Sequence, residues 1–164
     1  MKKVSVGAFV KYRVIKRRVG EQKPYIIDET EHNCFLVEGM NEMWNLILGL
    51  TATPFSSANA YIGVGDSSTA EDESQTGLQA TTNKYYKAMA TGYPKGPADA
   101  GDKKAVFRSV FASGEAEFAW NEVTVANGGS DAAKNMLRIV QSKGTKPSGE
   151  EWTAEIECTF QNPA

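Results

Sequence analysis

The sequence has little of the residue types on which most catalytic and metal sites depend. Its 164 residues include one histidine, His32, and two cysteines, Cys34 and Cys158, far apart along the chain. A metal site needs clustered ligands, and a nucleophilic triad needs a base beside its nucleophile, so neither is indicated. There is also no Gly-x-Ser-x-Gly motif. We therefore expect no enzyme, no cofactor and no metal, and two reduced thiols in preference to a disulfide.

Long apolar runs are missing as well. The longest, residues 43–50, is interrupted by Asn45 and Gly49 and is shorter than the roughly 18 residues that span a bilayer. Lys2 and Lys3 are not followed by the apolar stretch of a signal peptide. With 41% hydrophobic and 23% charged residues, the composition is that of a soluble globular protein. We expect no membrane association and a protein that acts in the cytoplasm or leaves it by a route other than secretion.

Charge of one sign is missing from two stretches. Residues 1–20 contain no acid, and residues 24–83 contain no lysine or arginine. A basic arm on an acidic body can dock on a neighbouring copy or bind nucleic acid, and it can also be a basic edge strand that discourages aggregation. Nucleic acid is the least favoured of the three. The candidate docking residues are Lys2, Lys3, Lys11, Arg13, Lys16, Arg17 and Arg18, with Asp66, Glu71, Asp72 and Glu73 as their acidic counterparts.

Apolar residues alternate with polar ones in several short stretches, which is the pattern of β-strands. Strands are predicted at residues 4–14, 25–28, 60–64, 84–89, 105–111, 116–120, 136–140 and 152–160. The first two form an N-terminal hairpin with a turn in RRVGEQKP, and ETEHN is a connector. Short strands separated by turn signals predict a mainly β protein, an antiparallel β-sandwich.

The period changes to that of a helix over about residues 38–50. The apolar residues on one face are Met40, Met43, Trp44, Ile47 and Leu48, and Gly49 is placed to cap the C-terminus. A stripe of methionine and tryptophan at this spacing is typical of core packing. We expect this face to be buried.

The stretch YIGVGDSSTAEDESQTGLQA, residues 61–80, begins like a nucleotide-binding loop. It has no third glycine at the required spacing and no lysine, and Asp66 would repel a phosphate. A calcium loop other than an EF-hand remains an alternative to a solvated acidic loop. Gly63 and Gly65 are interpreted as residues that let a strand end and turn. Farther along the chain, Glu122 is expected to be half-buried beside Arg108 or Arg138, sharing a face with Trp120.

Four segments in one order resemble a family of bacteriophage virion structural proteins found among tail, fibre-associated and other accessory components. They are HNCFLVEGMNEMWNLIL, YIGVGDSSTAEDESQTGLQA, AVFRSVFASGEAEFAWNEVTVANGG and KGTKPSGEEWTAEIECTF, and together they cover about residues 32–160. The resemblance implies a non-enzymatic β-sandwich module that is a building block or connector in the virion. It implies assembly in the host cytoplasm with other virion proteins and with copies of itself.

Two functions from different classes follow. The first is a virion subunit in the tail or at a fibre attachment, or alternatively a capsid decoration protein, whose residues 1–30 dock the sandwich of residues 31–164 on a neighbour. Removal of residues 1–20 is then expected to leave a folded domain. The second is a carbohydrate- or receptor-binding sandwich that uses Tyr61, Tyr85, Tyr86 and Tyr93 as stacking platforms, against the simpler explanation that these rings pack.

Overall fold

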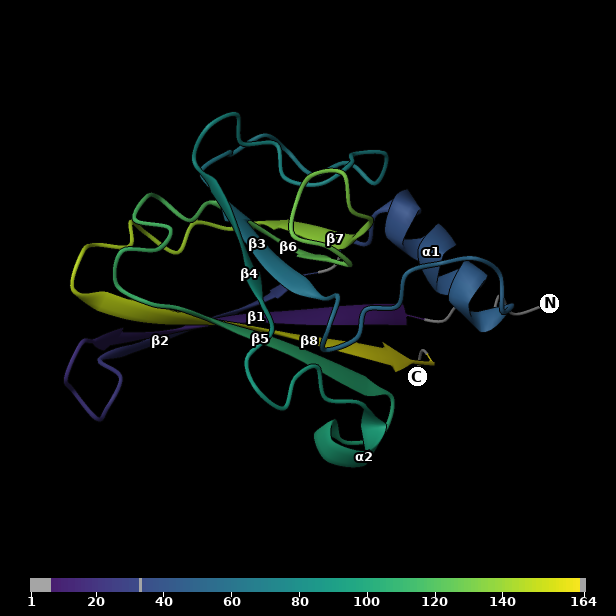
Figure 1. Ribbon diagram of the computed structural model, residues 1–164, viewed down its shortest axis with the longest axis horizontal. Helices are drawn as coiled ribbons and strands as arrows, with labels where there is room; N and C mark the ends of the chain where they lie inside the picture. Colours follow the sequence, from purple (N-terminus) through teal and green to yellow (C-terminus); the bar gives the residue numbers. More distant parts are fainter. Residues whose placement is uncertain (1–6, 33, 163–164) are drawn as a thin grey trace.

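A computed structural model describes residues 7–32 and 34–162, which form two four-stranded antiparallel sheets packed as a β-sandwich (Figure 1). Sheet A has the strand order β2-β1-β8-β5 and sheet B the order β4-β3-β6-β7. The strands of sheet A are β1 (Gly7–Arg18), β2 (Ile26–His32), β5 (Lys104–Phe111) and β8 (Glu150–Gln161). Those of sheet B are β3 (Tyr61–Gly65), β4 (Lys84–Ala88), β6 (Glu122–Ala126) and β7 (Asn135–Val140). The helices are α1 (Val37–Ile47) and α2 (Pro97–Ala100).

The predicted sandwich and its N-terminal hairpin are confirmed. Strand β8 shows why the alternation was informative, since Trp152, Ala154 and Ile156 point into the core and are at most 1% exposed. The intervening Glu151 and Thr153 are only partly buried. A period of two therefore separated the core face from the outer face correctly.

The core lies between the sheets and is centred on aromatic rings. Trp120 contacts Trp152 edge to face with the ring centroids 5.0 Å apart, and Phe111 contacts Trp120 in the same way at 4.7 Å. Aliphatic side chains of β1, β3, β6 and β7 surround these rings. Edge-to-face contacts add roughly 0.5–1.5 kcal/mol each beyond the area they bury, so this cluster is a main source of stability.

Strand β1 is an interior strand, which the sequence did not reveal. It pairs with β2 on one side and along its whole length with β8 on the other, from Gly7 opposite Gln161 to Arg18 opposite Glu150. The explanation of the basic stretch as an edge strand is therefore wrong for the described residues. Removal of residues 1–20 would remove β1 and separate β2 from its sheet, so that truncation is not expected to fold.

Other element boundaries also differ from the predictions. Strand β2 continues through the ETEHN stretch to His32, and the predicted strand at residues 116–120 is a turn and loop that precedes β6. The short helix α2 lies in a Gly/Pro-rich loop, GYPKGPADAG at residues 92–101. Residues 4–6 of the first predicted strand lie outside the described residues. Neither described helix has the length and apolar character needed to cross a membrane.

Candidate interaction surfaces

Helix α1 lies across one end of the sandwich, beside the start of β1 and the end of β8 (Figure 1). It is anchored through its small and polar residues. A Cβ on Gly39 would lie 2.5 Å from the carbonyl oxygen of Asn135 and 2.7 Å from that of Met136, so only glycine permits this approach to β7. The apolar side chains of the helix are consequently left on its other sides.

Two carboxylates complete the anchoring of α1. Glu42 is 8% exposed and accepts hydrogen bonds from the backbone N–H of Thr53 at 2.8 Å and from Nδ2 of Asn127 at 3.0 Å. Glu38 accepts hydrogen bonds from the backbone N–H and Nδ2 of Asn135 at 2.9 and 3.1 Å. The helix therefore turns its charged residues toward the protein body.

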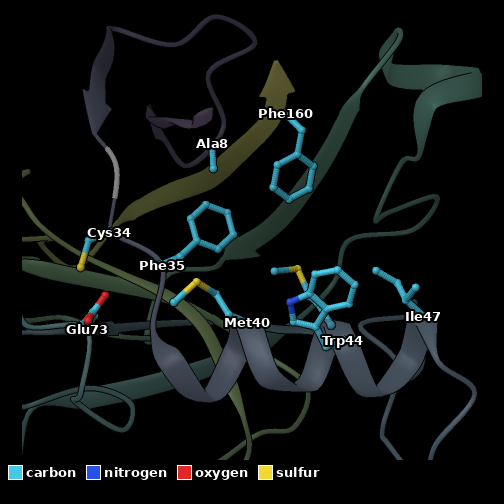
Figure 2. A pocket seen from close by; sticks show the side chains of 9 residues that line it. Ala8, Cys34, Phe35, Met40, Trp44, Ile47, Glu73 and Phe160 are labelled. Carbon is cyan, nitrogen blue, oxygen red and sulfur yellow. The ribbon is translucent and has the colours of Figure 1, made fainter. Parts of the chain in front are cut away.

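The apolar stripe of α1 borders an open groove. Met40, Met43, Trp44 and Ile47 form one wall, and Ala8, Phe35 and Phe160 lie opposite, around a space of about 680 Å³ (Figure 2). Trp44 is 61% exposed, Ile47 72%, Leu48 65% and Phe160 44%. The expectation that this stripe is core packing is wrong for most of it, because only Met43 packs against the core cluster. We call the exposed surface of Trp44, Ile47, Leu48, Leu50 and Phe160 the α1 face.

The basic side chains of β1 are used within their own sheet. On the outer face of sheet A, Arg13 donates from Nε to Glu29 of β2 at 2.8 Å and from a terminal nitrogen to Glu155 of β8 at 2.9 Å. Arg108 of β5 donates to the other oxygen of Glu155 at 2.8 Å. The row across the four strands thus alternates acid, base, acid, base. Each charge therefore lies beside an opposite charge on the neighbouring strand, which is the favourable arrangement in a sheet.

Neighbouring rows follow the same rule. Lys11 lies 3.5 Å from Glu29, and Arg17 lies 3.5 Å from Glu151. Arg18 pairs with Glu21 at 3.6 Å on the exposed turn. These exposed or partly exposed ion pairs contribute little to stability because solvent screens them, but they give most basic residues of the stretch a partner in their own chain.

Lys16 is not at the surface. It is 8% exposed, donates to the carbonyl oxygen of Lys143, and lies 4.2 Å from the ring centre of Trp152. Burial lowers the pKa of its ammonium group. Lys16 is therefore removed from the docking candidates, while Lys2 and Lys3 lie outside the described residues.

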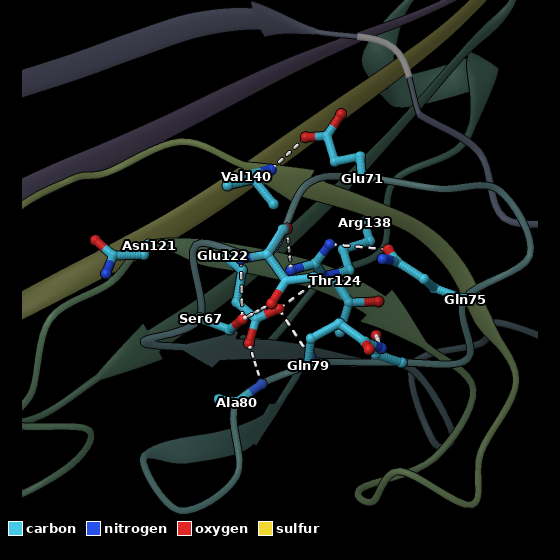
Figure 3. Close-up of polar contacts among 12 residues, drawn as sticks. Ser67, Glu71, Gln75, Gln79, Ala80, Asn121, Glu122, Thr124, Arg138 and Val140 are labelled. Carbon is cyan, nitrogen blue, oxygen red and sulfur yellow. Dashed lines mark hydrogen bonds and ion pairs between the residues drawn. The ribbon is translucent and has the colours of Figure 1, made fainter.

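The loop after β3 is fixed to sheet B by a buried ion pair, Glu122 of β6 and Arg138 of β7 (Figure 3). Both side chains are fully buried, with Arg138 Nε 2.7 Å from Glu122 Oε2. Glu122 also accepts hydrogen bonds from the backbone N–H of Gln79 at 2.9 Å and of Ala80 at 2.7 Å. Of the two expected partners, Arg108 and Arg138, the structure shows Arg138, and Glu122 is fully buried where half-burial was expected. Trp120 lies in the core and does not share the face of Glu122.

Arg138 ties the middle of the same loop. Its terminal nitrogens donate to Oε1 of Gln75 at 2.9 Å and to the carbonyl oxygen of Thr69 at 3.0 Å. One buried charge pair thus makes four hydrogen bonds to residues 69–80, two from each partner. A solvated acidic loop was expected, and residues 68–70, 72–74 and 76 are indeed exposed, while Leu78 and Ala80 of the same loop are buried over the outer face of sheet B.

The acidic residues of this loop have different roles. Glu71 accepts the backbone N–H of Val140 and lies 3.2 Å from His32. Asp66 accepts a hydrogen bond from Asn83 at 2.7 Å. Asp72 and Glu73 are exposed, and Glu73 lies at the rim of the groove beside Cys34. Of the four acidic candidates, these two are the exposed ones, and Asp66 and Glu71 are partly buried.

Gly63 and Gly65 are needed for close packing within β3. A Cβ on Gly63 would meet the ring of Tyr86 at 2.6 Å, and one on Gly65 would meet the Glu122 carboxylate and, at 3.0 Å, Ala80. The proposed turn at Gly63 is wrong, because Gly63 is in mid-strand and the strand ends at Gly65. No group of three or more potential metal ligands occurs among the described side chains.

The tyrosines considered as stacking platforms are partly buried. Tyr85 packs edge to face on Phe111 with its hydroxyl 3.2 Å from Glu115, and Tyr86 donates to Asp131 at 2.7 Å. The guanidinium carbon of Arg108 lies over the ring of Tyr93, 4.5 Å from the ring centre. Tyr61 is partly buried as well. The packing explanation fits these rings better than stacking against a sugar.

Both cysteines are free thiols. Cys158 faces the core, where burial raises its pKa to about 12. Cys34 lies at the groove, and its pKa is raised by burial and by the neighbouring carboxylate of Glu71. Neither thiol is activated as a nucleophile, because activation requires a lowered pKa.

Comparisons of the chain with family models, with curated proteins and with solved structures found no match.

Proposed function

We propose that this chain is a non-enzymatic structural subunit of a bacteriophage virion, located in the tail or at a fibre attachment, that docks on neighbouring subunits. The α1 face is the observation that carries the docking role. Soluble monomers rarely expose contiguous apolar patches larger than a few hundred Å², and larger ones mark interaction sites. The assignment to a virion is supported by the four resembling sequence segments.

The way α1 is anchored supports the same role. Gly39 and Glu42 fix the helix to the sandwich while Trp44 and Ile47 remain in solvent. A helix selected only for stability would turn its apolar stripe inward. The reversed orientation costs stability in the isolated chain, and contact with a partner would recover it.

Charge-mediated docking stays part of the proposal in a narrower form. Most described basic candidates have partners within sheet A, and Asp66 and Glu71 have partners of their own. Glu73 remains exposed at the groove and Asp72 is exposed next to it in the sequence, where they would attract a basic segment of a neighbour, although Asp72 also accepts hydrogen bonds from Ser74. Lys2 and Lys3, which lie outside the described residues, stay candidates for such a contact from a neighbouring copy.

The proposal is tested on purified phage particles. A phage that lacks the gene is complemented with the wild-type chain, with Trp44→Ser, or with Ile27→Ser as a matched control that is 60% exposed elsewhere. Incorporation is measured by quantitative mass spectrometry. We expect Trp44→Ser to lower incorporation at least tenfold, the loss of roughly 1.4 kcal/mol or more of binding, and Ile27→Ser to leave it unchanged.

A labelled chain that is absent from particles would overturn the virion assignment. Normal incorporation of a folded Trp44→Ser chain would overturn docking through the α1 face. Electron microscopy of labelled particles separates the positions, because density on the head would favour the capsid decoration alternative. The glycan-binding alternative gains no support from the tyrosines, and a glycan array without hits is expected.

A further inference from the structure

We propose that the occupant of the α1 face is a second copy of this chain, docked so that the two α1 helices lie antiparallel across a twofold axis. This inference rests on the proposed docking role of that face and names the partner. Each helix would lie against the groove of the other copy, between its α1 and its Phe160 (Figure 2).

The size of the exposed surface is sufficient for a reversible dimer. Two aromatic and three aliphatic side chains on and beside α1, 44–72% exposed, leave on the order of 500 Å² of apolar surface, and Trp44, Ile47 and Phe160 of this set border one groove. Two such faces together bury about 1,000 Å², which is the lower limit of specific interfaces. A weak, concentration-dependent dimer is therefore expected instead of a permanent one.

The charge distribution fits a twofold contact. In residues 37–47, all of which the structure describes, the only charged side chains are Glu38 and Glu42, and both bind the protein body. Residues near a twofold axis meet their own copies, so a charge there would face a like charge. The outer face of sheet A, by contrast, carries rows of charges. Two copies of that face would bring like charges together in many orientations.

The shape of the surface is self-complementary. Met40, Trp44 and Ile47 follow the i, i+4, i+7 spacing by which an amphipathic helix anchors in a groove. The receiving groove is bordered by the same residues on one side and by Phe35 and Phe160 on the other. One surface thus supplies both the inserted side chains and the site that receives them, as an isologous interface requires.

Sedimentation equilibrium of the full chain tests the association. We expect the wild type to change from monomer to dimer between about 10 and 500 µM, and Ile47→Glu to weaken the dimer at least tenfold. Ile27→Glu, at a comparably exposed residue of β2, is expected to leave the equilibrium unchanged. Circular dichroism and tryptophan fluorescence confirm that the variants are folded.

Cysteine cross-linking tests the orientation, in a Cys34→Ser background so that only introduced thiols are exposed. Position 40 of one antiparallel helix lies opposite position 47 of the other. A mixture of Met40→Cys and Ile47→Cys chains should therefore oxidise to a mixed disulfide faster than either chain forms a homodimer. Equal or faster homodimer formation by both variants would overturn the antiparallel arrangement.

Two results would overturn the inference as a whole, a wild type that is monomeric at 500 µM and an Ile47→Glu variant that dimerises normally. Neither result would change the expected outcome of the particle experiment, since a monomer can still join a virion by binding another protein. Conversely, a dimer in solution that is missing from particles would refute the proposed function and leave the self-association intact.

Discussion

Replacing Glu122 by glutamine removes one charge from the buried pair that fixes the 66–80 loop to sheet B. Glu122 accepts three hydrogen bonds, from Arg138 Nε and from the backbone N–H groups of Gln79 and Ala80. The substituted amide has one acceptor oxygen in place of two. At least one of these donors would lose its partner, and the guanidinium of Arg138 would be buried without a counter-charge.

The size of the expected stability loss follows from the burial of the pair. Both side chains are 0% exposed, so solvent cannot compensate for the missing partner. Breaking a buried ion pair on one side costs about 3–5 kcal/mol, a large part of the roughly 5–15 kcal/mol by which a domain is stable. We expect Glu122→Gln to lose about 3–5 kcal/mol, and Arg138→Met to lose a similar amount because it leaves a buried carboxylate.

The double variant Glu122→Gln/Arg138→Met isolates the pair. Since neither charge is then buried alone, its loss should be smaller than the sum of the single losses by about 1–3 kcal/mol. Glu21→Gln is the matched control, because its ion pair with Arg18 is exposed on both sides and should contribute less than about 1 kcal/mol.

Urea unfolding followed by tryptophan fluorescence gives the free energies, because Trp120 and Trp152 are buried in the core. Amide exchange at Gln79 and Ala80 reports the loop itself, and it should accelerate more in Glu122→Gln than the change in global stability accounts for. A Glu122→Gln chain within 1 kcal/mol of the wild type would refute the reasoning.

Two further predictions concern packing and titration. Gly39→Ala should destabilise the chain by about 1–3 kcal/mol in urea unfolding, because its methyl group meets the backbone of β7, while Gly96→Ala, which meets nothing within 4 Å, should be near neutral. Cys158 keeps its proton in the folded chain up to a pKa of about 12, whereas the unfolded thiol releases it near pH 9, so stability falls between these values. From pH 7.5 to 10 the wild type should lose roughly 1–2 kcal/mol more than Cys158→Ala, and equal losses would contradict this.

Local pattern was sufficient for most of the fold. The alternation in β8 and β1 identified strands and separated inner from outer faces, because side chains on a strand point alternately to opposite sides. The helical spacing from Met40 to Leu48 identified α1, because residues three or four apart lie on the same face of a helix. The predicted strand at residues 116–120 shows the limit, since its alternation was equally regular and Trp120 is in the core without being part of a strand.

The sequence by itself determined a mainly β chain, one amphipathic helix, reduced cysteines and an uneven distribution of charge, all of which depend on composition or on spacing along the chain. Tertiary structure alone decided what each face meets. It placed β1 between β2 and β8, where its basic side chains find acids, and it joined Arg138 to the loop of residues 69–80. It also turned α1 so that Gly39 meets β7 and Trp44 meets solvent, because a close backbone approach depends on a partner that lies almost a hundred residues away.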